Sequence, residues 1–373
     1  METTVSDHFP ILPSTAEDPV DALSHPPPAS SWDPEASPSF RPLREGTTPV
    51  HVSSSRDLLT RSQRRQARVA AEWGWQAAVR RLSGGVVKPR PGRAERAHRA
   101  GLTELRRAYS RPQTVMVANP KGGAGKTPTA WLLAATFGQS RGGYVLAWDD
   151  NETRGTLGVR SEGWDAITTV WDLLEDVDRF ETTAASVGDL GRYIRPQEAR
   201  FDVLASDDDA ARMAQIGEME FDRLQRVLTR FYRLLVVDTG NNLRAANWQA
   251  AVNTADLLVV PSTYELDAAY SAAWMLDHLC TAGREDLVAE AVTVLSPASP
   301  QIDKDVRAEL IKHFSRTAAV VEVPYDPGLV GGGPIDYRAL SEASRRAWVR
   351  VASVVSAGLG AADQRQRSGR GFR

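Results

Sequence analysis

Residues 119–127, with the sequence NPKGGAGKT, constrain the fold more than any other part of this 373-residue chain. They follow an apolar run, residues 114–118, and precede a helix-like run, residues 129–137. A glycine-rich turn between a strand and a helix aims several backbone N–H groups at one point, where the helix dipole adds positive potential. The stretch therefore predicts a phosphate-binding loop in which Lys126 contacts the phosphates and the Thr127 hydroxyl ligates Mg²⁺.

The distribution of charge divides the chain into segments. Residues 1–55 carry eight acids, two bases and many Pro and Ser residues, which predicts a disordered acidic leader. Residues 56–113 carry fifteen Lys and Arg against four acids, with apolar residues near helical spacing, which predicts a basic helical arm. The nucleotide-binding domain is expected over residues 114–358, and a basic disordered tail over residues 359–373.

Apolar strand-like runs alternate with amphipathic helical runs from residue 114 onward. The expected strands are 114–118, 144–148, 202–205, 233–238, 256–260, 289–295 and 319–323. The expected helices are about 127–139, 167–178, 217–231, 243–253, 265–281, 302–314 and 338–357. This alternation predicts an α/β fold, a doubly wound and mostly parallel sheet with helices on both faces. Ligands of such sheets bind at the carboxyl ends of the strands, where the loop 119–127 lies.

Cysteine and apolar content limit the class of protein. Cys280 is the only cysteine, which excludes an internal disulfide and a multi-cysteine metal site. No apolar run approaches the length of a membrane-spanning helix, and the first ten residues have acids and no long apolar core. We therefore expect a cytoplasmic protein without a transmembrane segment.

A second candidate for the magnesium site is Asp238, which ends the apolar run 234–238. An aspartate at the end of a strand beside a phosphate loop commonly holds Mg²⁺, usually through water, opposite the loop hydroxyl of Thr127. The alternative interpretation is an aspartate that only begins a turn.

The loop departs from the usual glycine-rich pattern in a way that is informative. Pro120 occupies the position of the first glycine, and a second lysine, Lys121, follows it. This Lys-Gly-Gly-x-Gly-Lys-Thr arrangement resembles the deviant Walker A loop of the ParA/MinD family of ATPases. The resemblance implies a Mg²⁺-dependent ATPase that forms a homodimer on ATP, in which Lys121 reaches the nucleotide of the partner subunit.

The resemblance also assigns roles after the second strand. Asp149 matches an aspartate that helps to organise magnesium, and Asn151 stands where relatives carry an aspartate that orients the attacking water. An amide cannot accept a proton as a carboxylate can, so slow hydrolysis is expected. Asp150 or Glu152 replaces it only if the loop turns differently, and an acidic loop that merely caps the next element remains an alternative.

Nucleotide-binding residues follow from the same resemblance. The candidates in the loop are Gly122, Gly123, Ala124, Gly125, Lys126, Thr127 and Pro128. Ser296, Pro324 and Tyr325 match base-binding segments, although relatives often place Asn at the position of Ser296. ATP is implied by the family, and the chain has no Asn-Lys-x-Asp segment of the kind that GTPases use for guanine.

Residues 73–85 and 155–160 resemble a branch of actinobacterial MinD-like ATPases, some associated with type VII secretion and others with partition. The resemblance favours a positional ATPase in chromosome or plasmid partition, with a ParB-like partner. The alternatives are an accessory ATPase of a type VII secretion system, with a secretion-system partner, and a slow nucleotide-sensing module. The arm 56–113 is expected to bind DNA without sequence preference. Packing on the ATPase core and contact with a membrane surface or a protein stay open.

Overall fold

The computed structural model describes residues 70–152, 154–163, 167–213 and 215–370. All of them belong to one compact unit, Arg68–Arg373. The expected acidic leader 1–55 and the first part of the arm, residues 56–69, lie outside the described residues.

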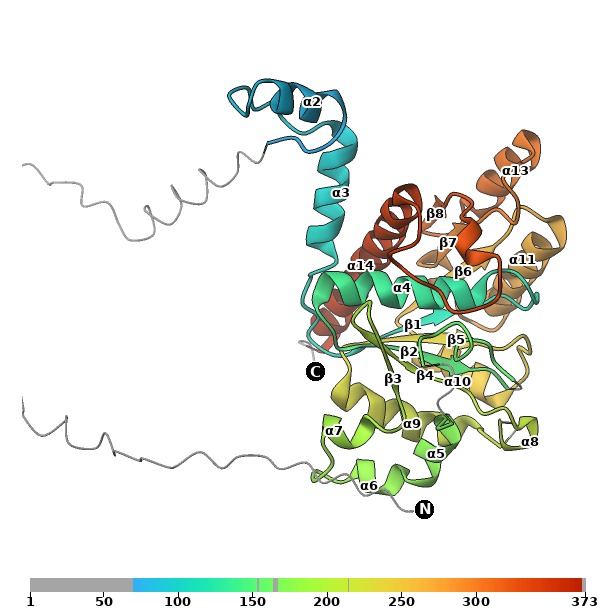
Figure 1. Ribbon diagram of the computed structural model, residues 1–373. Helices are drawn as coiled ribbons and strands as arrows, with labels where there is room; N and C mark the ends of the chain where they lie inside the picture. Colours follow the sequence, from blue (N-terminus) through green and yellow to red (C-terminus); the bar gives the residue numbers. More distant parts are fainter. Residues whose placement is uncertain (1–69, 153, 164–166, 214, 371–373) are drawn as a thin grey trace, which may run out of the picture. The chain divides into compact units, whose positions relative to one another are not determined.

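Eight strands of the described chain form one sheet, in the order β3-β4-β2-β5-β1-β6-β7-β8 (Figure 1). Their bounds are β1 Gln113–Val117, β2 Val145–Asp150, β3 Arg195–Gln197, β4 Phe201–Leu204, β5 Leu234–Thr239, β6 Leu257–Ser262, β7 Val292–Leu295 and β8 Ala319–Glu322. β3 pairs antiparallel with β4 at one edge, and the other pairs are parallel. The expected doubly wound, mostly parallel sheet is confirmed.

Helices cover both faces of the sheet (Figure 1). One face packs against α4 (Lys126–Arg141) and α14 (Glu342–Arg370). The other packs against α9 (Glu218–Phe231), α10 (Ala246–Thr254) and α11 (Leu266–Thr281). The remaining elements are α2 Gly74–Leu82, α3 Arg93–Glu104, α5 Val170–Glu175, α6 Val177–Glu181, α7 Val187–Leu190, α8 Ala210–Met213, α12 Glu285–Ala289, α13 Lys304–Phe314 and the 3-10 helix Pro327–Leu329.

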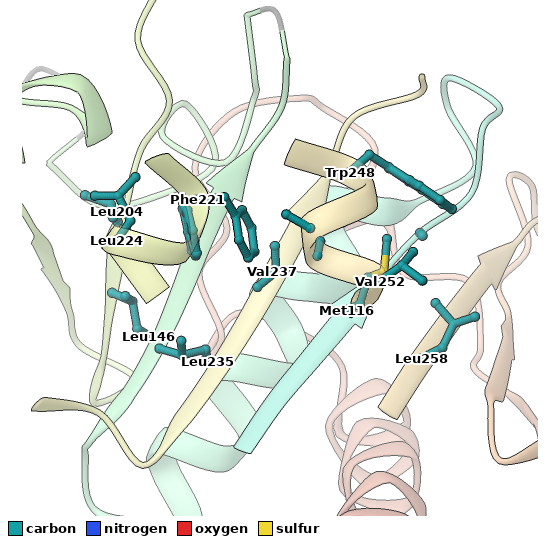
Figure 2. Packing of buried hydrophobic residues seen from close by; sticks show 14 of the residues in the cluster. Met116, Leu146, Leu204, Phe221, Leu224, Leu235, Val237, Trp248, Val252 and Leu258 are labelled. Atoms are coloured by element: carbon teal, nitrogen blue, oxygen red, sulfur yellow. The ribbon is translucent and has the colours of Figure 1, made fainter. Parts of the chain in front are cut away.

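Strands β1, β2, β5 and β6 are buried along their whole length, as expected for strands covered on both sides. Along each strand, successive side chains point to opposite faces of the sheet. Figure 2 shows Met116, Leu235 and Val237 on the face that α9 and α10 cover, where Phe221 and Trp248 complete the packing. These clusters fix the register of the strands. The candidate site lies at the carboxyl ends of these strands, so the register determines which of its residues are neighbours.

Several expected elements differ in their bounds from those observed, and two of the differences have a local cause. The expected helix 167–178 is two short helices, α5 and α6, because the chain leaves helical geometry at Asp176 (φ −98°, ψ 8°). The expected strand 289–295 begins only at Val292, since the short helix α12 occupies the preceding residues. The edge strand β3 was not expected, since its three residues are too few to show an alternating pattern.

The described part of the arm packs on the sheet domain through α3 and α14. Gly101 lies against Val349 and Ser353, where a Cβ at Gly101 would be 3.4 Å from the Ser353 side chain. The Tyr109 hydroxyl lies 2.8 Å from the Ser356 hydroxyl. The packing-arm interpretation therefore holds for α3.

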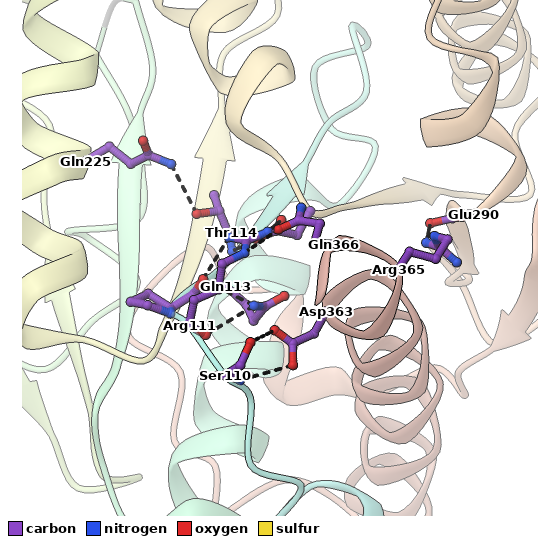
Figure 3. A network of polar contacts seen from close by, with 11 residues as sticks. Ser110, Arg111, Gln113, Thr114, Gln225, Glu290, Asp363, Arg365 and Gln366 are labelled. Atoms are coloured by element: carbon purple, nitrogen blue, oxygen red, sulfur yellow. Dashed lines mark hydrogen bonds and ion pairs between the residues drawn. The ribbon is translucent and has the colours of Figure 1, made fainter. Parts of the chain in front are cut away.

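The expectation of a disordered tail is wrong for residues 359–370, because α14 continues to Arg370. Leu359 and Ala362 are buried, and the Asp363 carboxylate accepts a hydrogen bond of 3.0 Å from the Ser110 backbone N–H (Figure 3). Arg365 forms an ion pair with Glu290. The basic composition of this segment suggested a solvated chain, whereas these contacts extend the helix.

Candidate nucleotide site

The glycine-rich loop links β1 to α4 and opens on a cavity of about 350 Å³. Gly123 (φ 82°) and Gly125 (φ 88°) have left-handed backbone, which glycine adopts without a steric penalty. Gly125 is the residue before α4, so the free N–H groups of the first helical turn face the cavity. The lining residues are Gly122, Gly123, Gly125, Lys126, Thr127, Pro128, Asn151, Arg154, Thr156, Arg160, Thr239 and Asn241.

Asn119 fixes the glycine-rich loop through hydrogen bonds of its side chain. Its side-chain amide donates to the carbonyl oxygens of Pro261 (2.8 Å) and Ala268 (3.2 Å), and its carbonyl oxygen accepts from the Lys121 N–H (2.9 Å). The amide is buried, so these bonds are made away from competing water. Sequence reasoning gave this residue no role, although a buried polar residue at a strand end is a usable signal.

Lys126 extends across the loop. Its ammonium donates to the Lys121 carbonyl oxygen (3.2 Å) and to the Asn241 side-chain oxygen. Burial lowers the pKa of Lys126, while the charges of Asp238 and Glu152 act in the opposite direction. The ammonium of this lining residue therefore lies near two anionic groups.

Lys121 turns away from that cavity. Its ammonium forms an ion pair of 2.8 Å with the Asp267 carboxylate in the first turn of α11. The contact raises the pKa of Lys121 and lowers that of Asp267, in both cases chiefly through the hydrogen bond between them. Within the single chain, Lys121 thus presents its side chain to α11 and not to the phosphate loop.

Asp149 and Asp238 are neighbours across the β2–β5 pair and share the α4 face of the sheet. They are register partners, and residues two positions earlier, Ala147 and Val236, belong to the cluster packed on α4. Burial raises the pKa of Asp149 to about 6, and burial together with the Asp149 charge raises the pKa of Asp238 to about 8. Two carboxyl groups this close and this buried do not ionise together without a cation.

A divalent cation fits these residues. The Oδ1 atoms of Asp149 and Asp238 are buried and accept no hydrogen bond from any described residue. The Thr127 hydroxyl bonds to Asp238 and lies 3.1 Å from the Thr156 hydroxyl. Mg²⁺ is usually held by one or two carboxylates together with hydroxyl, water and phosphate oxygens. The structure brings together the three residues predicted for the metal.

Asp150 lies on the opposite face of the sheet. Leu146 and Trp148, which share its side of β2, pack in the α9–α10 cluster. The Asn247 amide of α10 donates to the Asp150 carboxylate (3.3 Å) and to its backbone carbonyl oxygen (3.0 Å). Burial raises the pKa of Asp150 well above its usual range. Asp150 therefore does not face the phosphate loop.

The chain after β2 turns so that two candidate residues approach the cavity differently. Asn151 lines the cavity, and its backbone N–H donates to Asp149. The Glu152 carboxylate accepts from the N–H groups of Asn241 (3.2 Å) and Asn242 (3.0 Å). A Cβ at Gly240 would lie 1.4 Å from Glu152, so only glycine leaves room for this carboxylate.

Two arginines of the cavity were not predicted. Arg154 is exposed and pairs with Asp208 at 3.1 Å, and the Arg160 guanidinium donates to the Leu329 carbonyl oxygen at 3.1 Å. Burial lowers the pKa of Arg160. The signal in the sequence was the presence of two arginines six residues apart in the loop after β2, which is a weak pattern without the fold.

The three residues predicted for the base lie after β7 and β8. The Ser296 hydroxyl lies 3.5 Å from the place that a Cβ at Gly125 would occupy, so it borders the phosphate loop. Its backbone N–H donates to the Ser262 carbonyl oxygen (2.9 Å). Pro324 is exposed, Tyr325 is half-buried, and neither lines the cavity of the loop.

Solved structures show similarity to the fold. A ParA family ATPase from Chlorobium tepidum matches with a TM-score of 0.54 and 20% identity, covering 65% of this chain and 98% of that chain. The cell division ATPase MinD from Pyrococcus furiosus matches with a TM-score of 0.50 and 18% identity, covering the same two shares. The chain has the fold of ParA/MinD P-loop ATPases, as the resemblance of the loop predicts.

The chain is also similar in sequence to a secretion-associated protein. The ESX-1 secretion-associated protein EspI of Mycobacterium tuberculosis, from two strains, is 25% identical over 259 residues. The match covers 69% of this chain and 37% of EspI, so the chain spans little more than a third of the curated relatives it matches. No protein-family model matches the chain. Within the described residues, no helix combines the length and apolarity needed to cross a bilayer.

Proposed function

We propose that this protein binds ATP with Mg²⁺ and hydrolyses it slowly. The observation that supports this most directly is the convergence of four residues: Lys126 and Thr127, which line the loop cavity, and Asp149 and Asp238, which are register partners and adjoin them. Lys126 and the loop N–H groups bind the phosphates, while Thr127 and the two carboxylates hold the metal. When bound, Mg²⁺ supplies positive charge that stabilises the developing negative charge on the phosphates.

Slow turnover follows from the groups available for the attacking water. Asn151 lines the cavity but carries an amide, which orients water without accepting its proton. Glu152 does not line the cavity, and the Oε1 atom of its carboxylate accepts from the N–H groups of residues 241 and 242. Arg154 and Arg160 add positive charge at the same mouth. The arrangement favours a switch that holds ATP for long periods.

A homodimer that assembles on ATP completes the proposal. Lys121 is half-exposed and bonded to a surface carboxylate, so it is free to exchange that partner for a phosphate of a second copy. The cytoplasm is the place of action that we propose, since the site requires ATP.

The relative EspI favours a secretion-associated role, because its printed name links it to ESX-1 secretion. On this proposal, the protein is an accessory ATPase that meets a secretion-system protein. DNA partition, with a ParB-like partner, is the second candidate. It is favoured by exposed bases of the arm that form no ion pair with another described residue: Arg81, Lys88, Arg90, Arg93 and Arg96. Such charges suit duplex DNA without sequence preference.

The deciding experiment measures ATP turnover by the full chain with duplex DNA, with a candidate secretion-system protein, with anionic liposomes or with no addition. Stimulation by DNA supports partition, and stimulation only by a secretion-system partner supports the accessory ATPase. No turnover in any condition, with tight ATP binding, supports a nucleotide-sensing module. Lys126→Ala is the control, and unchanged affinity of this variant for a fluorescent ATP analogue would remove Lys126 from the site.

A further inference from the structure

A second cavity, of about 530 Å³, lies at the other end of α4. Tyr144, Arg200 and Arg233, each the residue before a strand (β2, β4 and β5), line it together with Arg106 and Arg141. Parallel strands run from this edge of the sheet towards the phosphate loop. The two cavities therefore occupy opposite ends of the strands, and α4 extends from one to the other.

Four arginines face this cavity without a carboxylate to balance them. Arg106 donates to the Ser140 carbonyl oxygen (3.3 Å) and Arg233 to that of Tyr109 (2.9 Å). Arg141 donates to the carbonyl oxygens of Leu105 (3.1 Å) and Arg107 (2.7 Å). None of the four forms an ion pair with an acid in the described part of the chain. Carbonyl groups hold the guanidinium groups of Arg106, Arg141 and Arg233 in place but leave their charge in full.

Arg141 experiences repulsion from Arg233. Burial is the main cause that lowers the pKa of Arg141; the Tyr109 ring, 4.9 Å away, raises it, and the charge of Arg233 lowers it by less than Tyr109 raises it. The C-terminal end of α4 carries only a partial negative charge, which is far from enough to balance four cations. A bound anion would remove this repulsion.

The backbone of the cavity is unusual as well. Tyr144 (φ 59°) and Arg200 (φ 62°) are the two non-glycine residues with positive φ in the described structure, and both line this cavity. Such backbone is uncommon outside glycine and clusters at functional sites. Gly138 of α4 fixes the turn that carries Arg200, because a Cβ there would lie 2.4 Å from the Arg200 carbonyl oxygen.

Tyr144 adds an aromatic surface. Its side chain is 65% exposed beside the arginines, where an ordinary packing role would bury the ring. One guanidinium group can bind two phosphate oxygens at once. An exposed aromatic ring beside it can stack on an unpaired base. The bases of a duplex are paired and stacked in its interior, so they present no free face on which the Tyr144 ring can stack.

We propose that the cavity is a second binding site, separate from the phosphate loop, for a nucleotide unit. The arginines would take its phosphate and Tyr144 its base. The unit comes from a free nucleotide or from single-stranded nucleic acid, which share this chemistry. The proposal does not depend on ATP hydrolysis.

The test uses the full chain with saturating Mg-ADP, which keeps the phosphate loop filled. A fluorescent oligothymidylate of about ten nucleotides, matched to typical single-strand site sizes, is the probe. The variant is Arg106→Gln with Arg200→Gln, since both side chains are exposed. Lys304→Gln with Lys312→Gln removes the same charge from α13 and serves as the matched control. Retained Mg-ADP binding shows that each variant is folded.

The arginine variant should lose at least tenfold in affinity, and its plot of log affinity against log salt should be shallower by about 1.4, at about 0.7 per lost phosphate contact. Tyr144→Asn, which suits this backbone, should weaken the oligonucleotide about fivefold or more but leave inorganic pyrophosphate unchanged. Thymidine monophosphate that competes as well as the oligonucleotide identifies a free nucleotide as the source, and a weaker competitor identifies a strand. Equal affinities of the arginine variant and its control would overturn the proposal, as would a preference for duplex DNA that Tyr144→Asn does not change.

Discussion

The charges around Lys126 determine how the cavity works at the residue scale. Asp238 and Glu152 place two carboxyl groups near the Lys126 ammonium, and Asp149 lies beside Asp238, in a region that burial makes costly for charge. Without metal, the arrangement is relieved by protonation of Asp238 and Asp149. With Mg²⁺, both carboxyl groups are expected to ionise.

This coupling predicts a dependence of stability on pH in the absence of metal and nucleotide. The folded-state pKa of Asp238 is raised from 3.8 to about 8. The stabilisation that it provides is therefore complete below about pH 4 and is lost as pH rises through about 8, at up to about 1.4 kcal/mol per pH unit. Asp238→Asn does not titrate, so its free energy of unfolding relative to the natural protein should increase over this range.

Urea unfolding at several pH values measures that difference. The natural protein is measured beside the variant at each pH, so the difference isolates the effect of this one carboxyl group. A constant difference between Asp238→Asn and the natural protein from pH 4 to 8 would contradict the predicted shift. Added Mg²⁺ with ADP should reduce the trend, because the metal favours the ionised carboxylate.

Asn151→Asp should raise ATP turnover. A carboxylate at this position accepts a proton from the attacking water, whereas the amide only positions it. A general base contributes typically about 10²–10⁴-fold, so partial restoration is visible over a slow background. Steady-state phosphate release measures the effect. Asp150→Ala, on the opposite face of the sheet, should leave the chemistry of the cavity intact, and if it alone abolished turnover, the assignment of this loop would be wrong.

Sequence reasoning succeeds at this scale where a residue ends a strand. Asp238 was predicted from the strand that it ends, and Asp149 from the resemblance of the segment after the second strand. Parallel strands deliver their last residues to the same edge, so the two carboxyl groups meet. Glu152 was left undecided, since its position depends on how the loop turns. The space at Gly240 that admits its carboxylate is a property of two loops together. No local sequence pattern shows that the loops of Glu152 and Gly240 come into contact.

At the scale of elements, most predicted helices and strands have nearly correct bounds, and the exceptions are elements that depend on distant contacts. Helix α9 was expected over 217–231 and spans Glu218–Phe231, because its amphipathic pattern is long enough to be distinct. Strand β3 depends on its pairing with β4, which the sequence does not display. The end of α14 depends on contacts with Ser110 and Glu290, far away in the chain.

The contact between α3 and α14 gives a prediction at this scale. Gly101→Val should destabilise the fold by about 1–3 kcal/mol, because its methyl groups would extend beyond a Cβ that is already 3.4 Å from Ser353. Gly101→Ala fits the available space and removes the flexibility of glycine, so it should be neutral or stabilising. Urea unfolding compares the two variants, and hydrogen exchange of the α3 amides reports local release. Equal stability of both would show that α3 does not pack closely on α14.

At the scale of the whole molecule, the proposed dimer makes the position of Lys121 significant. Its ammonium is paired with Asp267 on the surface, and surface ion pairs in water contribute little to stability. Replacing Asp267 by the phosphates of a nucleotide bound to a second copy therefore costs Lys121 little free energy. The same geometry implies that Lys121 contributes little to nucleotide binding within a single chain, because it does not line the cavity.

Lys121→Ala should therefore separate two properties. Nucleotide affinity of the monomer should remain within about twofold of the natural value, whereas the ATP-dependent dimer should weaken by at least tenfold, since a charge-assisted contact with phosphate is worth about 1.5–3 kcal/mol. Light scattering with a non-hydrolysable ATP analogue measures the dimer, and a fluorescent analogue measures affinity. Asp267→Asn releases Lys121 from its own chain and should leave the dimer intact or strengthen it. A dimer of natural strength in Lys121→Ala would exclude the proposed role of this lysine across the interface, and a loss of monomer affinity would instead place it at the nucleotide of its own chain.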